Sequence, residues 1–139
     1  MMRELYGQII MDHYHRPRNK GELENADIEE HLLNPLCGDE VTVYATFDGD
    51  KVTDVKFSGR GCSISQASAS MMTERLTGQS RGEIEAEIQG FKDMMTGEKD
   101  FPEHAELAAL KGVIQYPSRI RCATLAWNAF QQGMENAGE

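Results

Sequence analysis

The chain has 139 residues, of which 40% are hydrophobic and 27% are charged, and its formal net charge is −9. This acidic balance argues against nucleic acid or an anionic membrane surface as a partner, because phosphate groups bind to a basic face. The sequence has neither an apolar run of the roughly 20 residues that cross a membrane nor the apolar region of a signal peptide, so a cytoplasmic location is expected.

The chain begins with a pattern that predicts an amphipathic helix over residues 1–15. Leu5, Ile9 and Ile10 recur there at helical spacing. Pro17 disfavours helical backbone at the residue before it, so the helix is expected to end there. A polar stretch then leads to the next element.

Two segments of alternating polarity predict a small antiparallel sheet. The shared faces carry Val41, Val43, Ala45 and Phe47 in the first segment and Thr53, Val55 and Phe57 in the second. An Asp-Gly pair at residues 48–49 lies between them, and such a pair is a strong signal for a hairpin. With a short run around residues 31–33, the sheet is expected to have about three strands.

Helical patterns return from Ser63 onward. One face of the first helix should carry Ile64, Ala67, Met71 and Leu76. That helix should end at Gly78. The acidic stretch 79–111 predicts two or three short helices, and a last helix is expected over residues 122–134. Strands followed by helices packed against them predict a single α+β domain over residues 1–139.

The three cysteines lie at the boundaries of these elements, outside the apolar stripes. Cys37 lies in a turn-forming loop before the hairpin, and Cys62 lies where the second strand gives way to a helix. Cys122 lies at the expected start of the last helix, after Arg119 and Arg121. Helix N-termini and nearby cations stabilise the thiolate, which is the form that binds metal and attacks sulfur. These positions favour shared chemistry, although three separate buried thiols are the alternative.

Asp39 follows Cys37 by two residues in a glycine-containing loop, so its carboxylate can reach the same point in space. Three thiolates and one carboxylate would complete a tetrahedral zinc site or supply the ligands of a small iron–sulfur cluster. The alternative is that Asp39 only stabilises a turn. The spacing by itself leaves these alternatives open.

The cysteines stand in three motifs, NPLCGD at 34–39, GRGCSISQASASMM at 59–72 and SRIRCATLAW at 118–127. In this order they resemble the motifs of the IscU/NifU-type iron–sulfur scaffold family, and the opening residues 6–21 resemble its N-terminal helix and turn. The likeness extends over residues 6–131. It implies an α+β fold of the SufE/NifU-like kind, with a small antiparallel sheet packed against several helices. It also implies a role in iron–sulfur cluster assembly.

Within that family the chain is similar to SufU-type members. Arg121 stands where Isc-type scaffolds carry a histidine, and the Leu-Pro-Pro-Val-Lys segment that docks an Hsp70-type chaperone is absent. The resemblance implies a zinc ion held by Cys37, Asp39, Cys62 and Cys122.

The resemblance also implies partners. Sulfur would come from the persulfide of a SufS-like, pyridoxal-phosphate cysteine desulfurase, with Cys122 as acceptor and Arg119 supporting it. It would pass to a downstream Suf scaffold or to apo iron–sulfur proteins, so the chain would be at most a zinc-dependent sulfurtransferase. Two rival hypotheses are a scaffold that builds a [2Fe–2S] cluster on the same four side chains, and a purely structural zinc site.

Overall fold

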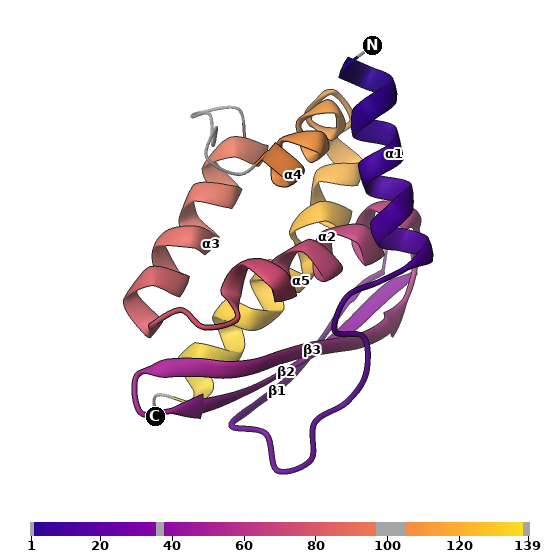
Figure 1. The fold of residues 1–139 in the computed structure, drawn as a ribbon. Helices are drawn as coiled ribbons and strands as arrows, with labels where there is room; N and C mark the ends of the chain where they lie inside the picture. Colours follow the sequence, from indigo (N-terminus) through magenta and orange to yellow (C-terminus); the bar gives the residue numbers. More distant parts are fainter. Residues whose placement is uncertain (1, 36–37, 97–104, 138–139) are drawn as a thin grey trace.

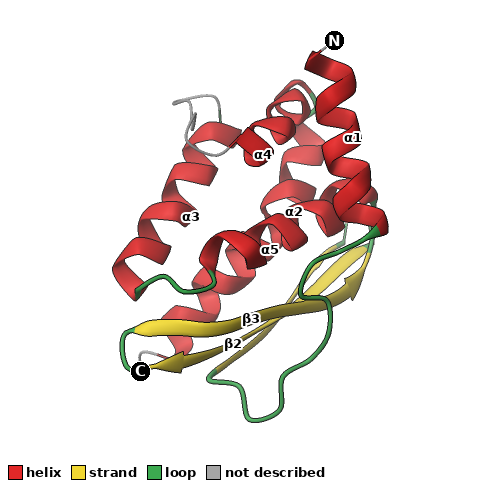
Figure 2. Ribbon diagram, viewed as in Figure 1, coloured by secondary structure: helices red, strands yellow, loops and turns green. Residues whose placement is uncertain are grey.

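The structure, a computed structural model, describes residues 2–35, 38–96 and 105–137 (Figure 1). In chain order its elements are α1 (Met2–His15), β1 (Ile28–Asn34), β2 (Asp39–Asp48), β3 (Lys51–Arg60), α2 (Ser63–Leu76), α3 (Arg81–Met95), α4 (Ala105–Ala108), the 3-10 helix η1 (Ala109–Gln115) and α5 (Pro117–Ala137). Figure 2 shows the sheet on one side of the molecule and the helices gathered on the other. The expected α+β class is confirmed. In the described ranges, no helix is both long and apolar enough to cross a membrane.

The sheet has three antiparallel strands in the order β1-β2-β3. Asp48 pairs with Lys51 across a two-residue turn, and Gly49 takes a φ of +64° in that turn. Glycine adopts positive φ without steric cost, which explains why the Asp-Gly pair marks the hairpin. The predicted hairpin and the predicted number of strands are both confirmed.

One position of β3 departs from the alternation seen in the sequence. Thr46 pairs with Asp54 but Phe47 pairs with Val52, so a bulge leaves Thr53 as an extra residue. A bulge shifts the side-chain period by one residue. As a result Val52 is buried and Thr53 is exposed, and the expectation that Thr53 shares the inner face is wrong.

Helix boundaries follow the sequence signals closely in the first half of the chain. α1 ends at His15, two residues before Pro17, and α2 ends two residues before Gly78, which has a φ of +88°. α3 is longer than the short helices expected for this stretch. Ser80 and Glu83 form a capping box at its start, in which the Ser80 Oγ accepts the Glu83 backbone N–H and the Glu83 carboxylate accepts the Ser80 N–H.

The core lies between the sheet and the helices. α2 packs on β3, and α5 packs on β1 and β2, so these two helices cover one face of the sheet (Figure 1). Trp127 of α5 is fully buried and stacks on Phe91 of α3 with 4.2 Å between ring centroids. Its Nε1–H donates to Ser68 Oγ of α2 at 3.0 Å. These contacts join α2, α3 and α5 into one packed layer.

Candidate metal centre

Three residues meet at one end of the sheet, on the face that α2 and α5 cover. Asn34 pairs with Asp39 across β1 and β2. Gly61 follows directly after Arg60, whose pairing partner is Glu40, so Gly61 continues the same row. The side chains of Asn34 and Asp39 are buried, with 5% and 1% of their surface exposed. Asn34 and Asp39 therefore place two buried polar side chains at the end of an otherwise apolar face.

Two helices bring cysteine sulfur atoms to this end of the sheet. Cys62 is the N-cap residue of α2, and Cys122 lies in α5. One ligand atom each from Asp39, Cys62 and Cys122 lies within 4.8 Å of the other two. The backbone N–H of Cys62 donates to Asp39 Oδ1 at 2.9 Å, and its Sγ lies 3.7 Å from Asp39 Oδ2. Three of the four donors expected from the sequence are thus brought together.

Cys37, the fourth expected donor, lies outside the described residues. The chain on either side of it is described. The Gly38 N–H donates to the Asn34 carbonyl at 2.8 Å, and Gly38 has a φ of +73°. This turn delivers Asp39 into its pairing position at the start of β2.

The position of Cys122 within its helix differs from the expected one. α5 begins at Pro117, a residue well suited to the first helical turn, so Cys122 lies in the second turn and is buried. The expectation that Cys122 stands at a helix start is wrong, and of the two described cysteines it is Cys62 that lies at one. Arg119 lies in the first turn of α5 with an exposed side chain, and its backbone N–H donates to the Tyr116 carbonyl at 2.8 Å.

The surroundings of Asp39 fit a bound cation. A buried carboxylate is stable when a positive charge or a metal compensates it. Among the described residues, no Lys, Arg or His forms an ion pair with Asp39, and its hydrogen bonds come from Cys62. One hard oxygen and two sulfur donors around one point suit zinc or the iron of a small cluster.

Two further residues, which the sequence motifs did not indicate, contact the ligands of this centre. A Cβ at Gly61 would lie 2.3 Å from Asp39 Oδ1 and 2.7 Å from Ser65 Oγ, so glycine is needed to leave room for the carboxylate. Asn34 donates its Nδ2–H to Cys122 Sγ, with 3.9 Å between nitrogen and sulfur. The period of two along β1, which places Asn34 on the same face as Leu32, is the signal that could have found it.

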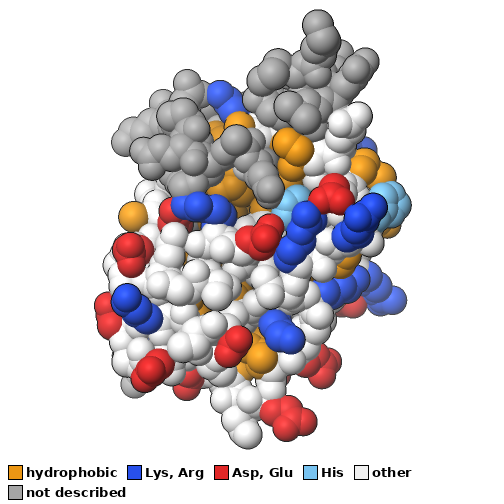
Figure 3. Space-filling view, viewed as in Figure 1, with side chains coloured by type: hydrophobic (Ala, Val, Ile, Leu, Met, Phe, Trp, Pro, Cys, Tyr) orange, Lys and Arg blue, Asp and Glu red, His pale blue; other side chains and the backbone are white. Residues whose placement is uncertain are grey.

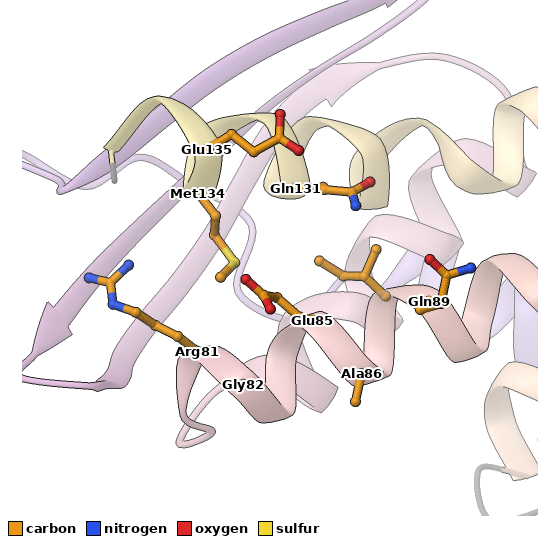
Figure 4. Close-up of a pocket in the computed structure, with 9 residues that line it drawn as sticks. Arg81, Gly82, Glu85, Ala86, Gln89, Gln131, Met134 and Glu135 are labelled. Atoms are coloured by element: carbon orange, nitrogen blue, oxygen red, sulfur yellow. The ribbon is translucent and has the colours of Figure 1, made fainter. Parts of the chain in front are cut away.

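Two hollows on the described part of the surface are lined by residues other than these three ligands. One, of about 640 Å³, lies between α3 and α5 (Figure 4), and its lining includes Arg81, Glu85, Gln131, Met134 and Glu135. A second, of about 320 Å³, lies on the open face of the sheet and is lined by His31, Glu40, Thr42, Ser58, Gly59 and Arg60. Neither contains a cysteine. Figure 3 shows acidic and basic side chains interspersed over most of the visible face, with several Lys and Arg side chains gathered at its right edge.

Comparison with known proteins places these motifs in a family. The profile of the NifU-like N-terminal domain matches residues 5–136. The zinc-dependent sulfurtransferase SufU of Bacillus subtilis (strain 168) is 47% identical over 132 residues, which are 94% of this chain and 89% of that protein. The iron–sulfur cluster assembly scaffold protein IscU of Streptococcus pyogenes serotype M1 is 39% identical over 139 residues, which are 98% of this chain and 86% of that protein.

Solved structures also resemble this chain. An iron–sulfur cluster assembly scaffold protein for the SUF system from Fervidobacterium islandicum AW-1 superposes with a TM-score of 0.84 at 38% identity, covering 94% of this chain and 97% of that one. A NifU-like protein from Brucella abortus shares the fold with a TM-score of 0.88 at 23% identity, covering 99% and 98%. The chain therefore belongs to the NifU-like N-terminal domain family, as the order of its three cysteine motifs indicated.

Proposed function

We propose that this protein serves iron–sulfur cluster assembly by accepting sulfur at a zinc-bound cysteine centre. The observation that carries the proposal is the convergence of Asp39, Cys62 and Cys122 within 4.8 Å, in a chain 47% identical to a zinc-dependent sulfurtransferase. The metal would be held by Cys37, Asp39, Cys62 and Cys122. When bound, zinc keeps thiolates deprotonated without adding redox chemistry of its own.

The proposed sulfur acceptor is Cys122, on the basis of its motif position. Its thiolate attacks the terminal sulfur of a desulfurase persulfide, so one S–S bond forms as the donor's S–S bond breaks and the donor cysteine leaves as a thiolate. No net oxidation occurs, because a neutral sulfur atom moves from one thiolate to another. Arg119, exposed one turn before Cys122, is proposed to contact the desulfurase.

Asp39 is the proposed exchangeable donor of the centre. A carboxylate oxygen is harder than a thiolate sulfur and binds zinc less strongly in such a set. The N–H of Cys62 holds Asp39 Oδ1 at 2.9 Å, so the carboxylate stays in place whether or not it binds metal. Release of Asp39 from the metal would therefore leave the backbone at Asp39 and the start of α2 intact.

A second candidate function is supported by the likeness to the scaffold protein IscU. In that case the same side chains would hold a [2Fe–2S] cluster as cargo before its transfer to apo-proteins. Both hypotheses imply a cysteine desulfurase as sulfur source, and a SufS-like enzyme is the proposed one.

A single domain over residues 1–139 and a cytoplasmic location remain predictions.

The experiment that separates these functions combines metal analysis with a turnover assay. Protein purified without added iron should contain one zinc per chain and should stimulate cysteine turnover by a SufS-like desulfurase. An iron–sulfur cluster without stimulation would favour the scaffold, and zinc without stimulation would favour a structural site.

The acceptor is identified by digestion and mass spectrometry after reaction with persulfide-loaded desulfurase. The added sulfur should be found on Cys122. A persulfide on Cys62 or Cys37 with Cys122 unmodified would overturn this assignment while leaving sulfur transfer intact. Cys62 is the stronger competitor, because it is the N-cap of α2 and is less buried than Cys122.

A further inference from the structure

The amide of Asn34 connects the end of β1 to the sulfur of α5. Its Nδ2–H donates to Cys122 Sγ at an N···S distance of 3.9 Å, across 88 residues of sequence. Both side chains are buried, with 5% of Asn34 and 1% of Cys122 exposed. A buried amide is stable when it is hydrogen-bonded, and one contact of this amide goes to a candidate metal ligand.

Another contact of this sulfur has the opposite polarity. Cys122 Sγ lies 3.9 Å from the carbonyl oxygen of Ser118, one turn earlier in α5. A thiol can donate its S–H to that carbonyl, whereas a thiolate has no proton and can only accept. Once Cys122 is a metal-binding thiolate, the contact with Ser118 loses its hydrogen bond and the contact with Asn34 keeps one.

We propose that Asn34 is a positioning residue that holds the Cys122 thiolate toward Asp39 and Cys62. This inference rests on the metal centre proposed above. A cysteine side chain has three staggered rotamers, and an N–H donor fixed on the neighbouring strand favours the one that faces the centre. Asn34 is well placed to be that donor, because it pairs with Asp39 in the sheet.

Hydrogen bonds around metal ligands orient those ligands and tune the metal. An N–H donor withdraws electron density from the sulfur, so transfer of charge from sulfur to the metal needs more energy. Removing the donor should shift the sulfur-to-cobalt charge-transfer band of the Co²⁺-substituted protein to longer wavelength. A role in folding alone would not move this band.

The test compares Co²⁺-substituted wild type with Asn34→Leu, which keeps the approximate size but has no N–H. We expect one Co²⁺ per chain in both proteins, a band at longer wavelength in the variant, and metal affinity lowered by roughly 10- to 100-fold. Asn34→Gln, which retains an N–H donor, should lie closer to wild type. Asn34→Ala serves the same purpose if the leucine variant does not fold, since a smaller side chain cannot overpack the site.

The matched control is Asn136→Leu. Asn136 Nδ2 donates to Glu30 Oε1 at 2.9 Å. This variant therefore also removes a hydrogen bond from a side-chain amide between α5 and β1, but at a site remote from the sulfur. Its spectrum should match wild type. An unshifted band in both Asn34→Leu and Asn34→Ala would overturn the role of Asn34, whereas a wild-type protein without any sulfur-to-cobalt band would overturn the metal centre itself.

Discussion

Gly61→Ala should damage the metal centre more than the fold. The added Cβ would lie 2.3 Å from Asp39 Oδ1, whereas ordinary contact begins at 3.4 Å, so the oxygen would have to retreat by about 1.1 Å. Asp39 is buried and accepts the Cys62 N–H, so it has little freedom to move. Overpacking of this kind typically costs about 1–3 kcal/mol, and the misplaced donor should lower zinc affinity by roughly 10- to 100-fold.

Gly78→Ala is the matched control for this prediction. Gly78 has a φ of +88° and no atom within 4 Å of an added Cβ, so the substitution adds backbone strain of roughly 1–2 kcal/mol without crowding a ligand. Urea unfolding should show that both variants are destabilised, and competition with a chromophoric chelator should show weaker zinc binding in Gly61→Ala alone. Wild-type zinc affinity in Gly61→Ala would show that this glycine is not needed to make room for the Asp39 carboxylate.

Four further predictions concern the stability of the protein. Removing zinc with a chelator should lower Tm but leave most of the far-UV helical signal, because the chain buries a core of its own; complete loss of that signal would contradict this. Ser80→Ala should cost about 1 kcal/mol in urea unfolding because it removes the N-cap of α3. Hydrogen bonds with the Ser80 backbone and side chain lower the pKa of Glu83 in the folded protein. The Glu83 carboxylate should therefore contribute its full stabilisation above the ordinary carboxyl pKa, and this contribution should be lost as the pH falls through the lowered pKa of the folded state. Trp127→Ala should cost roughly 3–5 kcal/mol, and a smaller loss would mean that the stack on Phe91 and the bond to Ser68 matter little.

Local sequence signals predicted the structure correctly wherever the backbone conformation requires a particular residue type. The Asp-Gly pair predicted the hairpin because Gly49 needs positive φ, and Pro17 and Gly78 predicted where two helices end. The bulge at Thr53 was missed because its register depends on the pairing partner in β2, which the alternation of one strand does not contain.

The start of α5 was missed for a different reason. Its first turn, Pro117 to Arg119, is exposed, so it has no apolar face from which a helical period can be detected. The motifs predicted that Asp39, Cys62 and Cys122 lie close together, but not that Asn34 contacts Cys122. That contact depends on how β1 lies against α5, which only the folded chain determines.

In the proposed centre, one oxygen and three sulfur atoms surround a single zinc ion. X-ray absorption at the zinc edge of the purified protein should show about three sulfur atoms at roughly 2.3 Å and one oxygen at roughly 2.0–2.2 Å. Cys122→Ser should lose one sulfur from that shell, and Asp39→Ala should lose the carboxylate oxygen while keeping all three sulfur atoms. A shell without sulfur, or one unchanged by either substitution, would contradict a zinc ion held by these side chains.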